Sequence, residues 1–438
     1  MCKNRQKLYD TFMLEKIGTS FVTFLRWSER HTKTDMVYLA KGGFWLTLSN
    51  IVSSVFSLIL AMAFSRLISQ SDYGTYQYII STVGILSIPT LVGINTAIVQ
   101  SVAKGHDKTV VSGLKIKMKW GLLGSLASLI TSVYYFYNEN LILGYGFGLS
   151  AFFIPLWENI GIYIHYLQGK KLFKQISVYE MISHGFSVAT LIICLLFISK
   201  DPVILVMTFF ASWSIARLFF YKHTLKHFPL NNSDDPGMKV YGKHLTIMSV
   251  IGTLGSNVDK IMLWHFLGPI QVAIYTFSLV IPLRIVNFAK VINRIAFPKL
   301  VQNTNKTANR ALLMKIFKLS VVLAIMAIIY YILIPYVFAV LFPQYVDSIP
   351  YTRLAIVLIL FQPLTLISSH LTANTKIKEL YGYNTFSPII KIILYIFLIP
   401  NYSIWGALLA TIASKIVDSA VLLYFFIISS RKCNPIIK

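Results

Sequence analysis

Long apolar runs recur along almost the whole sequence, and they limit the possible folds more than any other feature. From Gly43 onward the runs reach about 20 residues, the length that a helix needs to cross a hydrocarbon core about 30 Å thick. Hydrophobic residues make up 56% of the 438 residues, whereas soluble domains contain roughly 45 to 50%. The sequence therefore predicts a protein that is almost entirely a membrane domain.

The lengths of these runs predict an all-α integral membrane fold with about twelve spanning helices. Helices are expected because every backbone polar group must be paired inside lipid, and the runs lack the ten-residue alternation of a β-barrel. The predicted spans are 43–65, 76–100, 119–137, 141–165, 175–198, 202–221, 244–266, 270–297, 316–341, 351–371, 382–400 and 404–429.

Basic residues are distributed very unequally between the two sides of these spans. One side receives the lysines and arginines of segments 3–41, 104–117, 170–174, 222–243, 299–315, 376–378 and 431–438. The other side receives only Arg66, Lys200 and Arg353. Positive charge marks the cytoplasmic side of short membrane loops, so both termini are predicted to be cytoplasmic. The same distribution explains the net charge of +24 without nucleic acid, since a nucleic-acid binder gathers its basic residues on one soluble face.

A polar segment divides the spans into two sets of six. Its central part, 226–243, contains Pro, Gly, Asn and Asp and is predicted to be a linker. The predicted order is a basic N-terminal segment 1–42, a first lobe 43–222, a cytoplasmic linker 223–243, a second lobe 244–429 and a cytoplasmic tail 430–438. An offset of 199 residues aligns Thr47 with Thr246 and Tyr76 with Tyr275, which is consistent with two parallel structural repeats.

The N-terminal segment has two possible interpretations. Leu14, Ile17, Phe21 and Leu25 would share one face of a helix lying on the inner leaflet, but a disordered basic tail fits the composition as well. The segment is too charged for a cleavable signal peptide, so the first span is expected to act as an uncleaved anchor. The three cysteines are unclustered, so no disulfide framework, metal site or cofactor is predicted.

Nine Lys and Arg residues fall within or at the edges of the predicted spans. A charge at the bilayer centre costs roughly 3 kcal/mol on insertion scales, so it usually faces a cavity or a partner. Four residues near the cytoplasmic edge are expected to reach the interface instead: Lys119, Arg217, Arg294 and Lys318. The substrate-cavity candidates, all in the second half, are Lys260, Arg284, Lys290, Lys391 and Lys415. Arg284, Asn287 and Lys290 share an arc of roughly 120° on one helix, and Pro282 suggests a bend beside it.

Asp259 and Lys260 are adjacent in an apolar stretch and cannot pair well, because adjacent side chains point about 100° apart on a helix. We expect Asp259 to face a basic residue of a neighbouring helix, with Arg284 as the candidate. Lys260 is expected at a cavity, with Trp264 as a cation–π neighbour.

Several polar residues are candidates for ion coupling: Asp259, Glu158, Asp418 and Asn287. Lys415 and Asp418 are spaced i, i+3 and are expected to pair within their helix, either as a purely structural pair or as part of a site. A buried carboxylate is able to carry a coupling proton. In the first half Glu158 is the better candidate, since Glu180 lies near the cytoplasmic end of its span.

The sequence resembles the polysaccharide transporters, or O-antigen flippase type, of the multidrug/oligosaccharidyl-lipid/polysaccharide (MOP) exporter superfamily. The resemblance is strongest in Gly42 to Gly105, with Tyr73-Gly74-x-Tyr76 after the first span and Gly93 and Ala97 late in the second. It extends to the stretch from Asp259 to Ser278.

The resemblance implies two six-helix bundles, related by a pseudo-two-fold axis along the membrane normal, around a cavity that opens alternately to each side. It implies outward movement of an undecaprenyl-diphosphate-linked oligosaccharide across a bacterial or archaeal cytoplasmic membrane. The implied partners are this substrate, membrane lipids and glycan-assembly proteins. The cationic cavity of the family suits the five basic candidates.

Two other functions are weighed against a flippase. A cation-coupled multidrug exporter on the same scaffold would favour acidic groups, whereas the second half is mainly basic. A membrane glycan polymerase or ligase would need an acid/base constellation or a metal site, usually on a sizeable loop, and the predicted outer loops are short. We therefore predict a transporter and not an enzyme.

Overall fold

The computed structural model describes residues 36–302, 306–367 and 377–432, and the regular secondary structure of this part of the chain consists of helices, without a strand. The predicted all-α fold is therefore confirmed. The predicted N-terminal segment falls largely outside the described residues, as does most of the predicted C-terminal tail.

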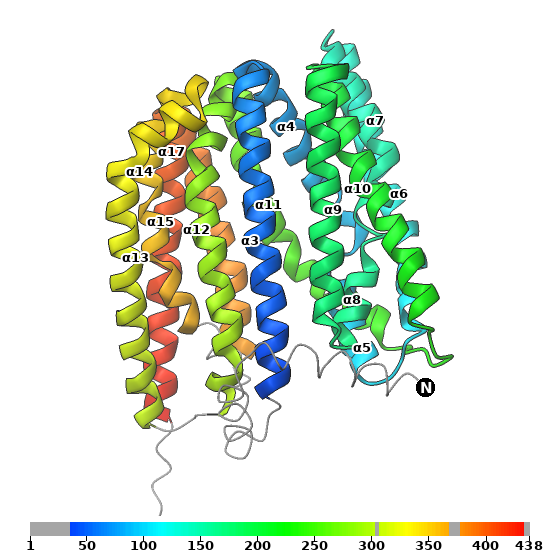
Figure 1. The fold of residues 1–438 in the computed structure, drawn as a ribbon, viewed down its shortest axis with the longest axis vertical. Coiled ribbons are helices and arrows are strands. Elements are labelled where there is room, and N and C mark those ends of the chain that lie inside the picture. The colour runs from blue at the N-terminus through cyan, green and yellow to red at the C-terminus, as the bar shows by residue number, and fades with distance from the viewer. Residues whose placement is uncertain (1–35, 303–305, 368–376, 433–438) are drawn as a thin grey trace, which may run out of the picture.

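The first bundle contains the elements before residue 228 (Figure 1). They are α3 (Met36–Leu67), α4 (Gln70–Leu86), η1 (Ile88–Thr90), α5 (Gly93–Ala103), α6 (Thr109–Tyr137), α7 (Leu141–Trp157), α8 (Ile162–Gly169), α9 (Phe173–Ile193), η2 (Cys194–Ile198) and α10 (Pro202–His227). Within it α6 packs on α7, α7 on α10, and α3 on α9.

The second bundle contains the remaining elements. They are α11 (Met238–Leu267), α12 (Pro269–Gln302), α13 (Lys306–Leu341), η3 (Pro343–Ser348), α14 (Ile349–Ala355), α15 (Val357–Leu360), η4 (Gln362–Leu364) and α17 (Ile377–Lys432). Helix α17 changes direction at Ser403, which has a left-handed φ of 54°. Tyr395 and Thr411, eight residues to either side, share a hydrogen bond of 2.8 Å, so α17 is a helical hairpin.

In the described residues, eight helices are long and apolar enough to cross a membrane, and nine if the bent pair Gln70–Leu86 and Ile88–Ala103 counts as one span. One of the eight, Ser387–Phe426, contains 40 residues and includes the hairpin of α17, so it can supply two crossings. Helices α6 and α11 have sufficient length but are interrupted by Gly, Ser, Tyr and Lys. With these two helices included, the architecture corresponds to the predicted twelve spans.

The two bundles are joined at one end of the helices, which is called the outer end after the predicted orientation. At the C-terminus of α13, backbone carbonyls lack intrahelical partners. Ser65 Oγ donates to the carbonyl of Leu341 at 3.0 Å, and Arg66 Nη2 donates to that of Val340 at 2.7 Å. The last turn of α3 therefore satisfies the exposed end of a helix in the other bundle.

An aromatic layer lies directly below these hydrogen bonds. The ring of Tyr73 is 4.9 Å from that of Phe277, which in turn stacks on Tyr345 at 3.6 Å. All three side chains are buried. Gly74 permits the close approach of α4 to the start of α12, because a Cβ atom at this position would be 1.9 Å from the carbonyl oxygen of Pro269.

A second backbone contact joins the bundles nearer the other end, between α5 and α11. The Gly93 amide donates to Thr246 Oγ1 at 3.0 Å, and a Cβ on Gly93 would be 2.2 Å from the Thr246 nitrogen. Ala97 is buried on the same helix. Three residues that carry the family resemblance, Tyr73, Gly74 and Gly93, thus lie at the contacts between the bundles. The ring of Tyr76 packs on Phe64 and Phe209 of the first bundle.

The polar connection between the bundles is docked onto the first bundle. Ser101 Oγ donates to Asp235 at 2.6 Å, Ser112 Oγ donates to Asp234 at 2.6 Å, and Thr109 Oγ1 accepts from the Asp235 amide at 3.0 Å. The hydrogen bond from Ser112 lowers the pKa of Asp234 below its ordinary value, and the bond from Ser101 does the same for the pKa of Asp235.

The close approach at Gly74 generates a prediction about stability. We expect Gly74→Ala to lower the free energy of unfolding by about 1 to 3 kcal/mol, the usual cost of overpacking, because the new methyl group meets backbone that cannot move away. The matched control is Gly252→Ala, whose Cβ would meet no heavy atom within 4 Å. Thermal denaturation of the purified variants measures the difference, and equal melting temperatures would contradict the prediction.

The docked connection generates a prediction about pH. A carboxyl group with a depressed pKa in the folded state stabilises that state above its unfolded pKa, and this stabilisation is lost as the pH falls through the folded value. We expect a nitroxide label at residue 232 to be immobile at neutral pH and to gain mobility below about pH 4. In a Ser101→Ala/Ser112→Ala variant the label should already be mobile at pH 7. An identical spectrum for both proteins at pH 7 would count against the docking.

Candidate functional site

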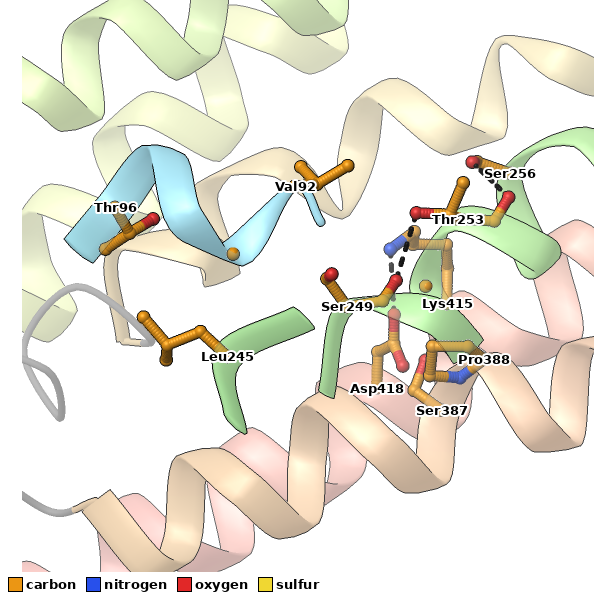
Figure 2. A pocket seen from close by; sticks show the side chains of 12 residues that line it. Val92, Thr96, Leu245, Ser249, Thr253, Ser256, Ser387, Pro388, Lys415 and Asp418 are labelled. Carbon is orange, nitrogen blue, oxygen red and sulfur yellow. Dashed lines mark hydrogen bonds and ion pairs between the residues drawn. The ribbon is translucent and has the colours of Figure 1, made fainter. Parts of the chain in front are cut away.

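A cavity of about 560 Å³ lies between the bundles, near the middle of α11 and of the second leg of α17 (Figure 2). Helix α5 and the turn before it form one wall, and α11 and α17 form the others. The lining residues are Val92, Gly93, Thr96, Leu245, Ser249, Gly252, Thr253, Ser256, Ser387, Pro388, Lys415 and Asp418.

Hydroxyl groups of α11 line one wall of this cavity. Ser249 Oγ donates to the carbonyl of Thr246 at 2.8 Å, Thr253 Oγ1 to that of Ser249 at 3.0 Å, and Ser256 Oγ to that of Thr253 at 2.9 Å. A hydroxyl has one hydrogen to donate and two lone pairs that accept. Because these hydrogens are already used within the helix, the wall offers mainly acceptors to a bound molecule.

The charged pair of the cavity is Lys415 and Asp418. Lys415 Nζ donates to Asp418 Oδ2 at 2.8 Å, which confirms the predicted i, i+3 pairing (Figure 2). The lysine side chain is 40% exposed and the aspartate side chain only 6%. The second carboxylate oxygen, Asp418 Oδ1, is buried and has no hydrogen-bond partner in the described part of the chain.

Lys391 lies beside the cavity on the first leg of α17, one turn after Pro388. Its Nζ donates to the backbone carbonyl of Gly255 at 2.9 Å and lies 5.1 Å from the centroid of the Tyr395 ring. These two partners are neutral, and the ammonium group also lies within electrostatic range of Asp259, Asp418 and Lys415. Lys391 is therefore a cation beside the cavity that belongs to a group of mixed charges.

Asp259 has a different partner from the expected one. Tyr275 Oη donates to Asp259 Oδ2 at 2.8 Å, and the aspartate is only 6% exposed. The expected pairing with Arg284 is therefore wrong. Asp259 lies near the end of α11, and α12 begins directly after this helix. Tyr275 is closer than Arg284 to the start of α12, and its hydroxyl group lies within hydrogen-bond distance of Asp259. Lys260 is half-buried on α11, outside the lining of the cavity.

Trp264 is not the partner of Lys260. Its ring stacks on Tyr78 of the first bundle at 4.5 Å, nearly parallel at 17°. The predicted cation–π neighbour is therefore wrong, because the Trp264 ring takes part in the contact between the bundles.

Arg284 faces the first bundle, away from the cavity lining. It is half-buried on α12 and lies within electrostatic range of Tyr73 on α4 and His184 on α9. Its Nε is buried without a hydrogen-bond partner in the described residues. Asn287 is half-buried one turn further along α12, and the side chain of Lys290 lies outside the described residues. The predicted basic residues therefore do not form one group: Lys415 and Lys391 lie at the cavity, whereas Arg284 lies against the first bundle.

Lys117 is a buried charge that the sequence analysis missed, because it was assigned to a basic loop. It is 0% exposed, and its Nζ donates to Asn95 Oδ1 at 2.8 Å. Asn159 Nδ2 donates to the Lys117 carbonyl at 3.0 Å. Glu158, half-buried at the C-terminus of α7, lies within electrostatic range. The available signal was a stripe of small residues on α6 that includes this position: Gly113, Gly121, Gly124 and Ser128.

Arg217 was expected to reach the membrane interface, and this expectation is wrong. Its guanidinium lies 5.1 Å from the ring of Trp213 and 5.8 Å from that of Trp157, and it donates to the Trp157 carbonyl. Lys119 and Lys318 are exposed, as expected, and the side chain of Arg294 lies outside the described residues. Within those residues, no group of His, Cys, Asp and Glu could hold a metal ion.

The family is decided by a comparison with protein-family models. Residues 39–303, more than half of the chain, match the model described as "Polysaccharide biosynthesis protein". The chain belongs to this family. No curated protein matches the sequence.

Solved structures of several transporters share the fold of this chain. An outward-facing multidrug resistance MATE family transporter of the MOP superfamily is 14% identical, with a TM-score of 0.65, and the alignment covers 90% of this chain and 97% of that one. The lipid II flippase MurJ, in an inward closed conformation, is 17% identical, with a TM-score of 0.64 and 88% of each chain covered.

A MOP superfamily transporter from Pyrococcus furiosus, characterised by a reverse polarity of its binding pocket, is 14% identical with a TM-score of 0.61, and 90% of this chain and 95% of that one are covered. The predicted MATE-like fold is therefore confirmed.

The contrast between Lys117 and Lys119 generates a prediction. We expect Lys117→Met to lower the free energy of unfolding by about 1 to 3 kcal/mol, because Asn95 and Glu158 lose a buried partner. Lys119→Met, two residues along the same helix, removes the same charge from an exposed position and should change stability by less than about 0.5 kcal/mol. Thermal denaturation measures both variants, and equal effects would show that Lys117 contributes no more than a surface lysine.

Proposed function

We propose that the protein is a flippase that moves an undecaprenyl-diphosphate-linked oligosaccharide from the inner to the outer leaflet by alternating access. The observation that carries this proposal is the position of the cavity. It lies between the bundles near the middle of the spans, and it combines hydroxyl acceptors with Lys415. Sugar hydroxyls would donate to these acceptors, and a phosphate group would bind the ammonium.

The electrostatic balance around the cavity supports an anionic substrate. Lys391 is held by neutral groups, and Asp259 is held by Tyr275. A cation in a medium of low dielectric constant attracts a diphosphate more strongly than it does in water. The prenyl chain of the substrate would remain in the bilayer while the diphosphate enters between the bundles. The membership of a polysaccharide biosynthesis family is consistent with this substrate class.

The proposed location is a cytoplasmic membrane, with both termini on the cytoplasmic side. The basic connections 104–108 and 170–172 lie at the same end as the docked connection 228–237, as alternation of the helices requires. Positive charge on that side is the usual orientation of membrane proteins. The proposed lobes are 43–222 and 244–429, with the linker between them.

A cation-coupled multidrug exporter is the second candidate, since MATE transporters have the same fold. The excess of basic residues beside the cavity argues against organic cations as substrates. Growth of a host strain in the presence of organic cations separates the two functions, because only an exporter would protect the cells.

Charge reversal beside the cavity tests the flippase. We expect Lys391→Glu and Lys415→Glu each to reduce surface glycan at least about tenfold, because a carboxylate at the cavity repels the diphosphate. Lys119→Glu is the control, because it makes the same charge change at an exposed position. Surface glycan is measured by antibody or lectin binding to cells that lack the chromosomal copy, and lipid-linked sugar should accumulate on the cytoplasmic leaflet. Normal display by both cavity variants at normal expression would refute the proposal.

A further inference from the structure

Lys415 is a cation that lines the cavity, and it already forms an ion pair with Asp418. The two side chains are 2.8 Å apart, and both come from the same helix (Figure 2). The lysine is partly exposed to the cavity, whereas the aspartate is buried behind it. A ligand entering the cavity therefore meets an ammonium group whose charge is balanced by a carboxylate.

Structural stabilisation alone explains this pair poorly. A carboxylate that is buried for stability normally has both oxygens hydrogen-bonded, because an unpaired buried acceptor costs free energy. Asp418 Oδ1 is buried and has no partner among the described residues. Thr96, Ser249 and Thr253 lie in the same cavity lining, but none of them donates to it.

Membrane lipids make a free lysine at this position a liability. Most anionic headgroups are phosphodiesters with one negative charge, and they are far more abundant than any lipid-linked precursor. An uncompensated ammonium group in a low-dielectric cavity would bind them. Specific binding sites often reject the wrong partner by a built-in repulsive or competing group.

We propose that Asp418 is a specificity-determining residue, which makes Lys415 available only to an anion with more than one negative charge. This inference rests on the proposed flippase function and assigns the role of Asp418 within it. A singly charged phosphodiester exchanges one negative partner for another and gains little. It also leaves Asp418 buried and unpaired, which is costly.

A diphosphate offsets the free-energy cost of leaving Asp418 unpaired, because it brings more than one negative charge to the site. One phosphate group takes Lys415 from Asp418, and the second interacts with Lys391, whose ammonium group donates to the Gly255 carbonyl and lies within electrostatic range of Lys415, Asp418 and Asp259. The geometry therefore favours diphosphate lipids over ordinary anionic lipids.

The experiment compares two probes, undecaprenyl diphosphate and phosphatidylglycerol, on the full-length protein in phosphatidylcholine nanodiscs. Native mass spectrometry gives the ratio of their affinities. We expect wild type to prefer the diphosphate and Asp418→Asn to lose about tenfold of this preference, mainly by binding phosphatidylglycerol more tightly. Asp347→Asn, the same change at an exposed residue of η3, should leave the ratio unchanged.

Two further proteins show whether the effect passes through Lys415. Lys415→Gln should weaken diphosphate binding, and adding Asp418→Asn to it should change the ratio no further. An unchanged ratio in Asp418→Asn, with wild type binding the diphosphate, would overturn this inference and leave the flippase standing. Failure of wild type to bind the diphosphate at all would overturn both.

The wild-type protein alone provides a test if Asp418→Asn does not fold. The affinity of wild type should decrease from undecaprenyl diphosphate to undecaprenyl monophosphate to phosphatidylglycerol, because the competing carboxylate penalises each loss of charge. Equal affinities of wild type for the diphosphate and for phosphatidylglycerol would overturn the inference without any variant.

Discussion

A charge inside a membrane protein must be paired, hydrogen-bonded or placed beside water, and this requirement determines where the polar groups of this fold lie. Lys117 meets it with the side-chain oxygen of Asn95 and the nearby carboxylate of Glu158, and Arg217 with two tryptophan rings and a carbonyl. Lys391 meets it with a carbonyl and an aromatic ring, and Lys415 with a carboxylate at the edge of a cavity. Only the last arrangement leaves a cation exposed to a ligand.

The bundles touch through backbone as well as side chains, and this limits how they can move. At Gly74 and Gly93 the main chains are so close that no side chain fits between them. Such contacts are either made in full or broken, since a packed interface does not deform continuously. The outer contact also includes hydrogen bonds from Ser65 and Arg66 to the end of α13. Separation of the bundles at this end would have to break these bonds together with the aromatic layer around Tyr73.

Features that depend on residues close together in the sequence were predictable, whereas features that depend on contacts between distant helices were not. The spans were predictable because apolar length is a local property, and so was the Lys415–Asp418 pair, because i, i+3 neighbours share a helix face. The partner of Asp259 was not predictable, since several helices could have supplied it and Tyr275 did. Lys117 was not predictable as a buried charge because its basic neighbours are typical of a loop, whereas the helix already begins at Thr109 and buries that face.

The two bundles use their buried charges for different purposes. In the first bundle Lys117 is fully buried, its ammonium group donates to Asn95, and its backbone carbonyl accepts from Asn159. These bonds offset the cost of burying the charge, and the ammonium group is not accessible to a ligand. In the second bundle Lys415 has one acidic partner, and that partner is itself incompletely satisfied. The exposed ammonium group of this pair is accessible to a second anion, whereas that of Lys117 is not. The pair lies on the helical hairpin that forms one side of the cavity, so an exchange of the partner of Lys415 acts directly on the surface between the bundles.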